Sequence, residues 1–176
     1  QGGWLPRWGY ANFETNIMTG DPVTPFLVDL WRFGALKGRE AEAYAALREN
    51  AFGVPAHGIR PQGRSGNPSY LKQGFVQYDR SFISKGMDTD PHHGASATLE
   101  YAAADGALAV MAAALGHQDD AKVLAQRALN WKTIWDPSVV DAETGQKGFP
   151  RPRLLDGSWF GDVGSGYDPR GDHGFH

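Results

Sequence analysis

The spacing of apolar residues predicts a first helical hairpin near the start of the chain. Apolar positions recur at helical spacing over 23–36 and again over 40–51. The first stripe follows Asp21 and Pro22, a candidate N-cap and a proline suited to the first helical turn, and Gly38 separates the two stripes. Because the link is only a few residues long, we expect the two helices to run antiparallel.

A second hairpin is predicted further along the chain. The strongest helical stripe covers 96–115, where Ala is abundant on all sides, and this abundance indicates close neighbours on more than one face. Gly116 ends this stripe, and a fourth helix is predicted over 119–135 before Asp136 and Pro137.

Long segments rich in Gly and Pro precede, separate and follow the two hairpins, over 1–22, 52–94 and 136–176. None of them shows a convincing strand alternation. The fold class is therefore predicted to be all-α, with the rhythm of an (α/α)6 toroid, in which tight turns lie at one end and long connections build a pocket at the other. About four helices of the ring fit in this chain, so we expect only part of a toroid. The alternative is a small irregular helical bundle with large loops.

Composition and charge narrow the function. Hydrophobic residues at 41% and charged residues at 21% are typical of a packed globular protein. The net charge of −3 gives no electrostatic basis for binding nucleic acid. The chain has no Cys, which excludes thiolate metal sites and thiol nucleophiles, and no apolar run approaches the roughly 20 residues that span a bilayer.

The most suggestive local feature is the loop Gly2-Gly-Trp-Leu-Pro-Arg-Trp8. It places the indoles of Trp4 and Trp8 and the guanidinium of Arg7 on a stiffened segment. Indole faces stack on the C–H faces of sugar rings, and an Arg donates paired hydrogen bonds to hydroxyls or carboxylates. The loop therefore indicates sugar binding, with the alternative that both indoles anchor the loop to the core. Asp21 has a similar alternative, as a helix cap.

Other chemical motifs are weak or absent. In Asp90-Pro-His-His-Gly94 the two His are adjacent and lack the i, i+4 spacing of metal ligands on one helix face, so a loop or helix-entry role is favoured. The segment from Asp156 has Tyr167 where a calcium loop needs Glu. No phosphate-binding loop, serine-hydrolase elbow or zincin His pair occurs.

Glycoside hydrolysis requires two carboxylates on opposite sides of the scissile bond. Eight carboxylates lie in predicted loops, and nothing in the sequence selects a pair among them: Glu14, Asp21, Asp88, Asp90, Asp156, Asp162, Asp168 and Asp172.

Several short motifs together resemble glycoside hydrolase family 92. They occur in the family's order along the whole chain: Gly2-Gly-Trp-Leu-Pro-Arg-Trp8, Met18-x-Gly-Asp21, Ser96-Ala-Thr-Leu-Glu-Tyr101 with Asp105, Leu115-Gly116, Trp135-Asp-Pro137, Asp156-Gly-Ser-Trp159 and Gly174-Phe-His176. The resemblance implies a calcium-dependent, inverting exo-α-mannosidase acting on mannose-containing glycans. It also implies an N-terminal β-sandwich followed by an (α/α)6 toroid, in a secreted or cell-surface bacterial enzyme.

The same resemblance implies that residues 1–176 are an internal fragment of one catalytic domain. In the family, the general acid is a Glu directly after the Gly-Phe-x run, and the general base and most calcium ligands lie further on. We therefore assign no catalytic residue and no Ca²⁺ ligand to this chain, whose partners would include the remainder of the domain.

The candidate substrate-binding residues are Trp8, which resembles a ring contacting the sugar in the −1 subsite, and its neighbours Arg7, Trp4 and Asp21. Leu99, Glu100, Tyr101 and Asp105 are expected to organise an inner helix, with Asp105 bonding a neighbouring loop. Two other functions stay open, a toroid glycosidase acting on another α-glycoside and a non-catalytic carbohydrate-binding module.

Overall fold

A computed structural model describes residues 3–10, 13–14, 18–55, 63–79, 81 and 89–161. The described part is mostly helical, with two small antiparallel sheets of two strands each. The predicted all-α class is therefore confirmed at the level of a mainly helical fold. None of the helices in the described ranges combines the length and apolar character that crossing a bilayer requires.

The first predicted hairpin is present as helices α1 (Val23–Arg32) and α2 (Glu40–Phe52). Helix α1 ends four residues earlier than the sequence pattern indicated. Gly34, which follows the C-cap residue Phe33, adopts φ +77°, and the Ala35 N–H donates to the Leu30 carbonyl at 2.9 Å. This is a Schellman ending, which stops the helix while satisfying its last carbonyls.

The second predicted hairpin consists of α4 (Gly94–Ala114) and α5 (Gln118–Arg127). Gly116, with φ +88°, closes the turn between them. The prediction that the fourth helix reaches residue 135 is wrong, because the chain changes to a 3₁₀ turn, η2 (Asn130–Ile134), and then to a strand.

The prediction that the chain has no strands is also wrong. Strand β3 (Trp135–Val140) pairs with β4 (Lys147–Pro150), and β1 (Gly9–Tyr10) pairs with β2 (Phe13–Glu14). In the sequence, Pro137 indicated the end of the preceding helix, so the strand β3 that contains it was not predicted. A proline is tolerated there because a two-stranded ribbon has a free edge on each strand.

The long loop predicted over 52–94 contains a short helix, α3 (Asn67–Gln73), and a 3₁₀ turn, η1 (Asp90–His93). Seven residues are too few to display a helical period, which explains why the sequence pattern missed α3. The η1 turn runs directly into α4, so the helix-entry role predicted for the Asp-Pro-His-His-Gly segment is confirmed.

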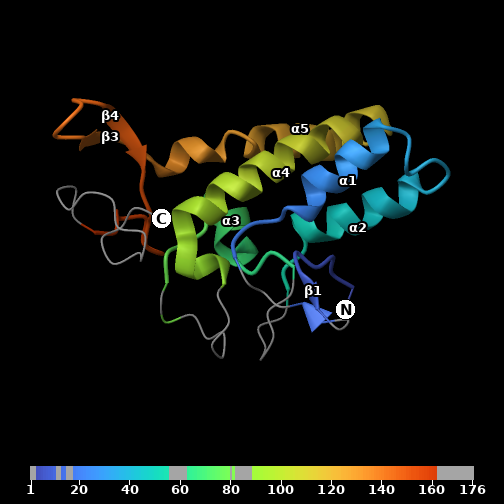
Figure 1. Ribbon diagram of the computed structural model, residues 1–176, viewed down its shortest axis with the longest axis horizontal. Helices are drawn as coiled ribbons and strands as arrows, with labels where there is room; N and C mark the ends of the chain where they lie inside the picture. The colour runs from blue at the N-terminus through green and yellow to red at the C-terminus, as the bar shows by residue number, and fades with distance from the viewer. Residues whose placement is uncertain are drawn as a thin grey trace.

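Helix α4 lies at the centre of the molecule and contacts α1, α2 and α5 (Figure 1). Its abundant Ala residues allow this close packing on several faces, as the composition indicated. The main core is formed by side chains from α1, α2, α4 and α5, among them Val28, Tyr44, Leu47, Leu108, Met111 and Leu124. The α1–α2 and α4–α5 turns lie together on the right of Figure 1, whereas β1 lies below the helices and β3–β4 lies at the far end.

Candidate functional site

The Trp-rich loop at residues 4–8 is anchored to α2. The N–H of Leu5 donates to Asn50 Oδ1 at 3.1 Å, and Asn50 Nδ2 donates back to the Leu5 carbonyl at 3.3 Å. Asn50 is itself buried. This reciprocal pair fixes the middle of the loop against the first helical hairpin.

The two indoles of the loop differ in their surroundings. Trp4 is partly buried and lies against the backbone of two loop glycines, since a Cβ added at Gly53 or Gly63 would lie within 2.4 or 2.5 Å of its ring. Trp8 is 54% exposed. Trp4 therefore anchors the loop, which is the alternative that the sequence left open, while the indole of Trp8 is accessible to a ligand.

The side chain of Arg7 points inward, and its guanidinium contacts one carboxylate and two backbone carbonyls. It is 3% exposed and forms a bidentate ion pair with Asp90, with Nη2–Oδ2 at 2.8 Å and Nη1–Oδ1 at 3.1 Å. It also donates to the carbonyls of Met18 (2.6 Å) and Gly63 (3.2 Å). Burial disfavours the charged guanidinium, but the Asp90 carboxylate outweighs this and raises the pKa of Arg7.

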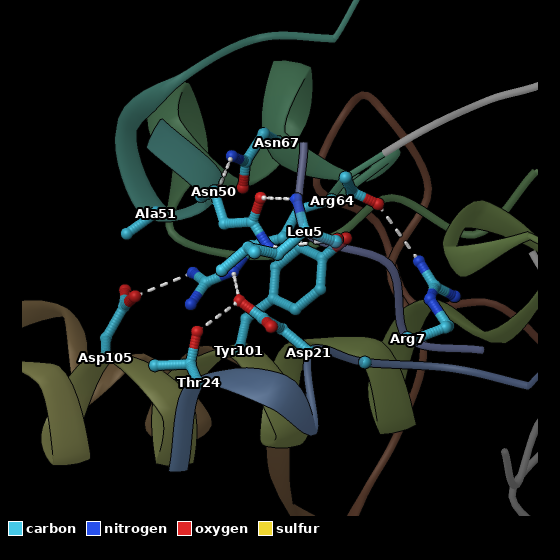
Figure 2. Close-up of polar contacts among 12 residues, drawn as sticks. Leu5, Arg7, Asp21, Thr24, Asn50, Ala51, Arg64, Asn67, Tyr101 and Asp105 are labelled. Atoms are coloured by element: carbon cyan, nitrogen blue, oxygen red, sulfur yellow. Dashed lines mark hydrogen bonds and ion pairs between the residues drawn. The ribbon is translucent and has the colours of Figure 1, made fainter. Parts of the chain in front are cut away.

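Asp21 belongs to a buried charge cluster rather than to a helix cap. No side chain caps α1, and Asp21 Oδ2 instead accepts hydrogen bonds from Thr24 Oγ1 (2.8 Å) and Arg64 Nε (2.8 Å). Arg64 also donates to Asp105 Oδ1 at 2.6 Å, so its guanidinium lies between two carboxylates (Figure 2). Burial opposes the charge of Arg64, and the two carboxylates raise its pKa.

The predicted bond from Asp105 to a neighbouring loop is confirmed by the Arg64 ion pair. Asp105 Oδ2 also accepts from the Tyr70 hydroxyl at 3.0 Å and lies 3.1 Å from Arg127 Nε. Within the described residues, Arg64 Nη2 and Asp21 Oδ1 are buried without a protein partner. The cluster therefore joins α1, α3, α4, α5 and the loop before α3 through charged contacts.

Asp90 is the centre of a second buried cluster. Besides Arg7, its carboxylate accepts the Gly20 N–H (2.9 Å), the Ser65 N–H (3.1 Å) and Oγ (2.9 Å), and the Tyr101 hydroxyl. Burial and the Asp90 charge raise the pKa of Tyr101, so this phenol acts as a neutral hydrogen-bond donor.

Glu100 differs from these carboxylates because it has no hydrogen-bond or ion-pair partner among the described residues. It lies on α4 against Gly20, where an added Cβ would meet Glu100 Oε2 at 2.9 Å. Although Glu100 is exposed overall, partial burial of its carboxylate, together with the nearby Asp21 and Asp90 carboxylates, raises its pKa.

The remaining loop carboxylates divide into two groups. Glu14 accepts the N–H groups of Arg7 (2.6 Å) and Trp8 (3.4 Å), and Asp156 accepts from Ser158 in an exposed turn. Four predicted candidates lie outside the described residues: Asp88, Asp162, Asp168 and Asp172. Across the ranges the structure describes, no three acidic or His side chains converge as a metal-binding group.

The structure thus brings Trp4, Arg7 and Trp8 together on one loop and places Asp21 in the adjoining cluster. Sequence reasoning missed Arg64, which lies in the segment read as a long loop. A signal did exist, because Asp105 falls one turn after Tyr101 on a buried helix face. A carboxylate at such a position needs a cationic partner.

Comparisons with known proteins give a consistent result. The model of the glycosyl hydrolase family 92 catalytic domain matches residues 1–176. No curated protein matches the chain.

Solved structures that resemble the chain include the family GH92 inverting mannosidase BT2199 from Bacteroides thetaiotaomicron. It superposes with a TM-score of 0.73 and 28% identity over 99% of this chain and 20% of that one. The GH92 α-mannosidase BT3965 of the same organism, also solved with mannoimidazole, has a TM-score of 0.68 and 26% sequence identity. The match covers 94% of this chain and 18% of that protein. The GH92 glycosyl hydrolase ccman5, at 22% identity and a TM-score of 0.51, shares the fold. The chain spans about a fifth of the length of the two mannosidases and 15% of ccman5.

Proposed function

The chain belongs to glycosyl hydrolase family 92, and from this membership we propose that it is part of an inverting, calcium-dependent exo-α-mannosidase. The observation that carries the proposal is the match of the family's catalytic-domain model to the whole chain. The likeness to two mannosidases at 26% and 28% identity supports mannose as the sugar.

We propose that residues 1–176 form part of a longer (α/α)6 catalytic domain. Two α-helical hairpins with short turns at one end support this, and so does the share of about a fifth of the relatives' length. Family 92 membership further supports an N-terminal β-sandwich and a secreted or cell-surface bacterial enzyme.

In this proposal the chain contributes one wall of the sugar pocket. Trp8 is the predicted sugar contact, because its exposed indole projects from a loop that is fixed at both backbone and side chain. Trp4, Arg7 and Asp21 stay candidate binding residues, and their existing protein contacts favour a role in holding the loop.

An inverting hydrolysis needs a general acid and a general base roughly 6.5–9.5 Å apart, with a water between the base and the anomeric carbon. We propose that both carboxylates, and the calcium ligands, come from segments of the longer domain. Within the described ranges, no three or more His, Cys, Asp or Glu side chains form a group that could hold a metal ion. No step of the reaction is assigned to these residues through calcium.

The test is to incubate the full-length protein with α-1,2-linked mannobiose, with calcium or with EDTA, and to follow the released anomer by NMR. The expected result is calcium-dependent release of β-mannose. Release that survives complete calcium removal would contradict the calcium dependence. Sugar binding without any release would favour a non-catalytic carbohydrate-binding module, and release only from another α-glycoside would replace mannose as the substrate.

A matched pair of variants tests the sugar contact. Trp8→Ala should lower kcat/KM about tenfold, equivalent to the loss of about 1.4 kcal/mol of stacking with the sugar. Trp131→Ala is the control, since Trp131 is also an exposed indole, 40% accessible, but lies in η2 after α5. Equal kinetics for the two variants would remove Trp8 from the site.

A further inference from the structure

The Asp90 carboxylate is fully buried and receives donors from four other parts of the chain. They are the guanidinium of Arg7 in the Trp-rich loop of residues 4–8 (the Trp loop), the Gly20 N–H before α1, the N–H and hydroxyl of Ser65 before α3, and the Tyr101 hydroxyl on α4. Ser65 Oγ accepts the Asp90 N–H in return at 3.2 Å. Such a fully bonded carboxylate holds these segments in a single arrangement.

The link to the Trp loop is strong because Arg7 is held at both ends. Its guanidinium binds Asp90 in a bidentate manner and reaches two further carbonyls, and its backbone N–H donates to Glu14 at 2.6 Å. Bidentate Arg–carboxylate pairs fix orientation as well as distance. Trp8 follows directly in the chain, so the backbone from which its exposed indole projects is fixed as well.

We propose that Asp90 is the positioning residue of Trp8: through Arg7 it holds the Trp loop so that the indole stands at one orientation on the surface. The positioning itself is a property of this chain. Its value for catalysis rests on the proposed function, in which Trp8 contacts the sugar.

The chemistry of the contacts requires a carboxylate at position 90. In an Asn, one oxygen is replaced by an NH₂ group that can only donate. At the Oδ2 position that group would face donors from Arg7, Ser65 and Tyr101. Asp90→Asn therefore keeps the size of the side chain but loses the charge and several hydrogen bonds.

The direct test is ¹⁹F NMR of the full-length protein labelled with 5-fluorotryptophan, with the Trp8 signal assigned by Trp8→Phe. Asp90→Asn should shift and broaden the Trp8 signal. The matched control is Asp136→Asn, which neutralises another buried carboxylate, paired with Arg151 at 2.9 Å in the β3–β4 region. The control should leave the Trp8 signal unchanged. A Trp8 signal that Asp90→Asn does not move would overturn the proposal.

A kinetic cycle tests the same idea through activity. Asp90→Asn should lower kcat/KM, by no more than Trp8→Ala, and adding it to Trp8→Ala should cause little further loss, because both changes act on one contact. Losses that multiply would show that Asp90 acts by another route. A Trp8→Ala enzyme with normal kcat/KM would instead refute the sugar contact, while the ¹⁹F result would still decide the positioning.

Arg7→Lys provides a second variant if Asp90→Asn does not fold. It keeps the positive charge beside Asp90 but cannot form the bidentate pair. The Trp8 signal should shift and broaden in the same way, and an unchanged signal in this variant would also contradict the proposal.

Discussion

Arg64 shows how much of this structure depends on single buried charges. Its guanidinium is 1% exposed and joins Asp21 on one side to Asp105 on the other, with both carboxylates also nearly inaccessible. Removing three charged groups from water is costly, and their ion pairs and hydrogen bonds offset that cost. Once the cluster exists, the loss of Arg64 leaves Asp21 buried without a cation and Asp105 with Arg127 alone, which is the more damaging situation.

Replacing Arg64 should therefore destabilise the protein strongly. Arg64→Met keeps most of the volume but leaves the buried Asp21 without a cation and Asp105 with Arg127 as its remaining one, at an expected cost of about 3–5 kcal/mol. The matched control is Arg39→Met, because Arg39 pairs with Glu42 at 2.8 Å with both side chains about 70% exposed. Calorimetry of the full-length protein should show a much lower Tm for the first variant and no measurable change for the second. Similar Tm values would contradict a structural role for the cluster.

At the level of elements, helix α4 ends by the same device as α1. Gly116 follows the helix with φ +88°, its N–H donates to the Ala113 carbonyl at 3.2 Å, and the His117 N–H donates to the Ala112 carbonyl at 2.8 Å. This Schellman motif turns the chain into α5 within three residues. The packing of the second hairpin therefore depends on a left-handed backbone position.

Two substitutions at Gly116 separate conformation from packing. An added Cβ would meet no atom within 4 Å, so only the left-handed backbone opposes a side chain there. Gly116→Ala should cost about 1 kcal/mol, and Gly116→Asn should cost less, because Asn tolerates this conformation better. Tm values from thermal unfolding of the full-length variants decide the point. An Asn variant as unstable as the Ala variant would refute the conformational explanation.

The four long helices could be predicted because apolar periodicity is a local property of the sequence. Helix α3 and strand β3 could not, since seven residues show no period and Pro137 reads as a helix end. The same distinction between local and long-range features applies to the candidate site. The Trp loop was evident from its composition, whereas Arg7 meets Asp90 across 83 positions and Asp21 meets Arg64 across 43. Such pairings depend on tertiary packing, which no short motif encodes.

At the scale of the molecule, the α4–α5 hairpin presents an open groove of small residues. The groove is lined by Gly106, Ala109, Val110, Ala113, Gln118, Ala121, Lys122, Ala125 and Ala128. Val110, at 54% exposure, is its largest apolar side chain. A surface of this kind suits the close approach of another helix. It therefore agrees with the proposal that this chain is one part of a larger helical domain.

Residues 1–176 expressed alone should then bind a hydrophobic dye such as anilinonaphthalene sulfonate and self-associate, because the groove would face water. Val110→Lys should reduce dye fluorescence by placing a charge in the groove. Gln126→Lys adds the same charge on an exposed part of α5 outside the groove and should leave the fluorescence unchanged. The full-length protein should bind little dye. A monodisperse, cooperatively unfolding monomer of residues 1–176 would contradict the larger domain, because its helical faces would need no further partner.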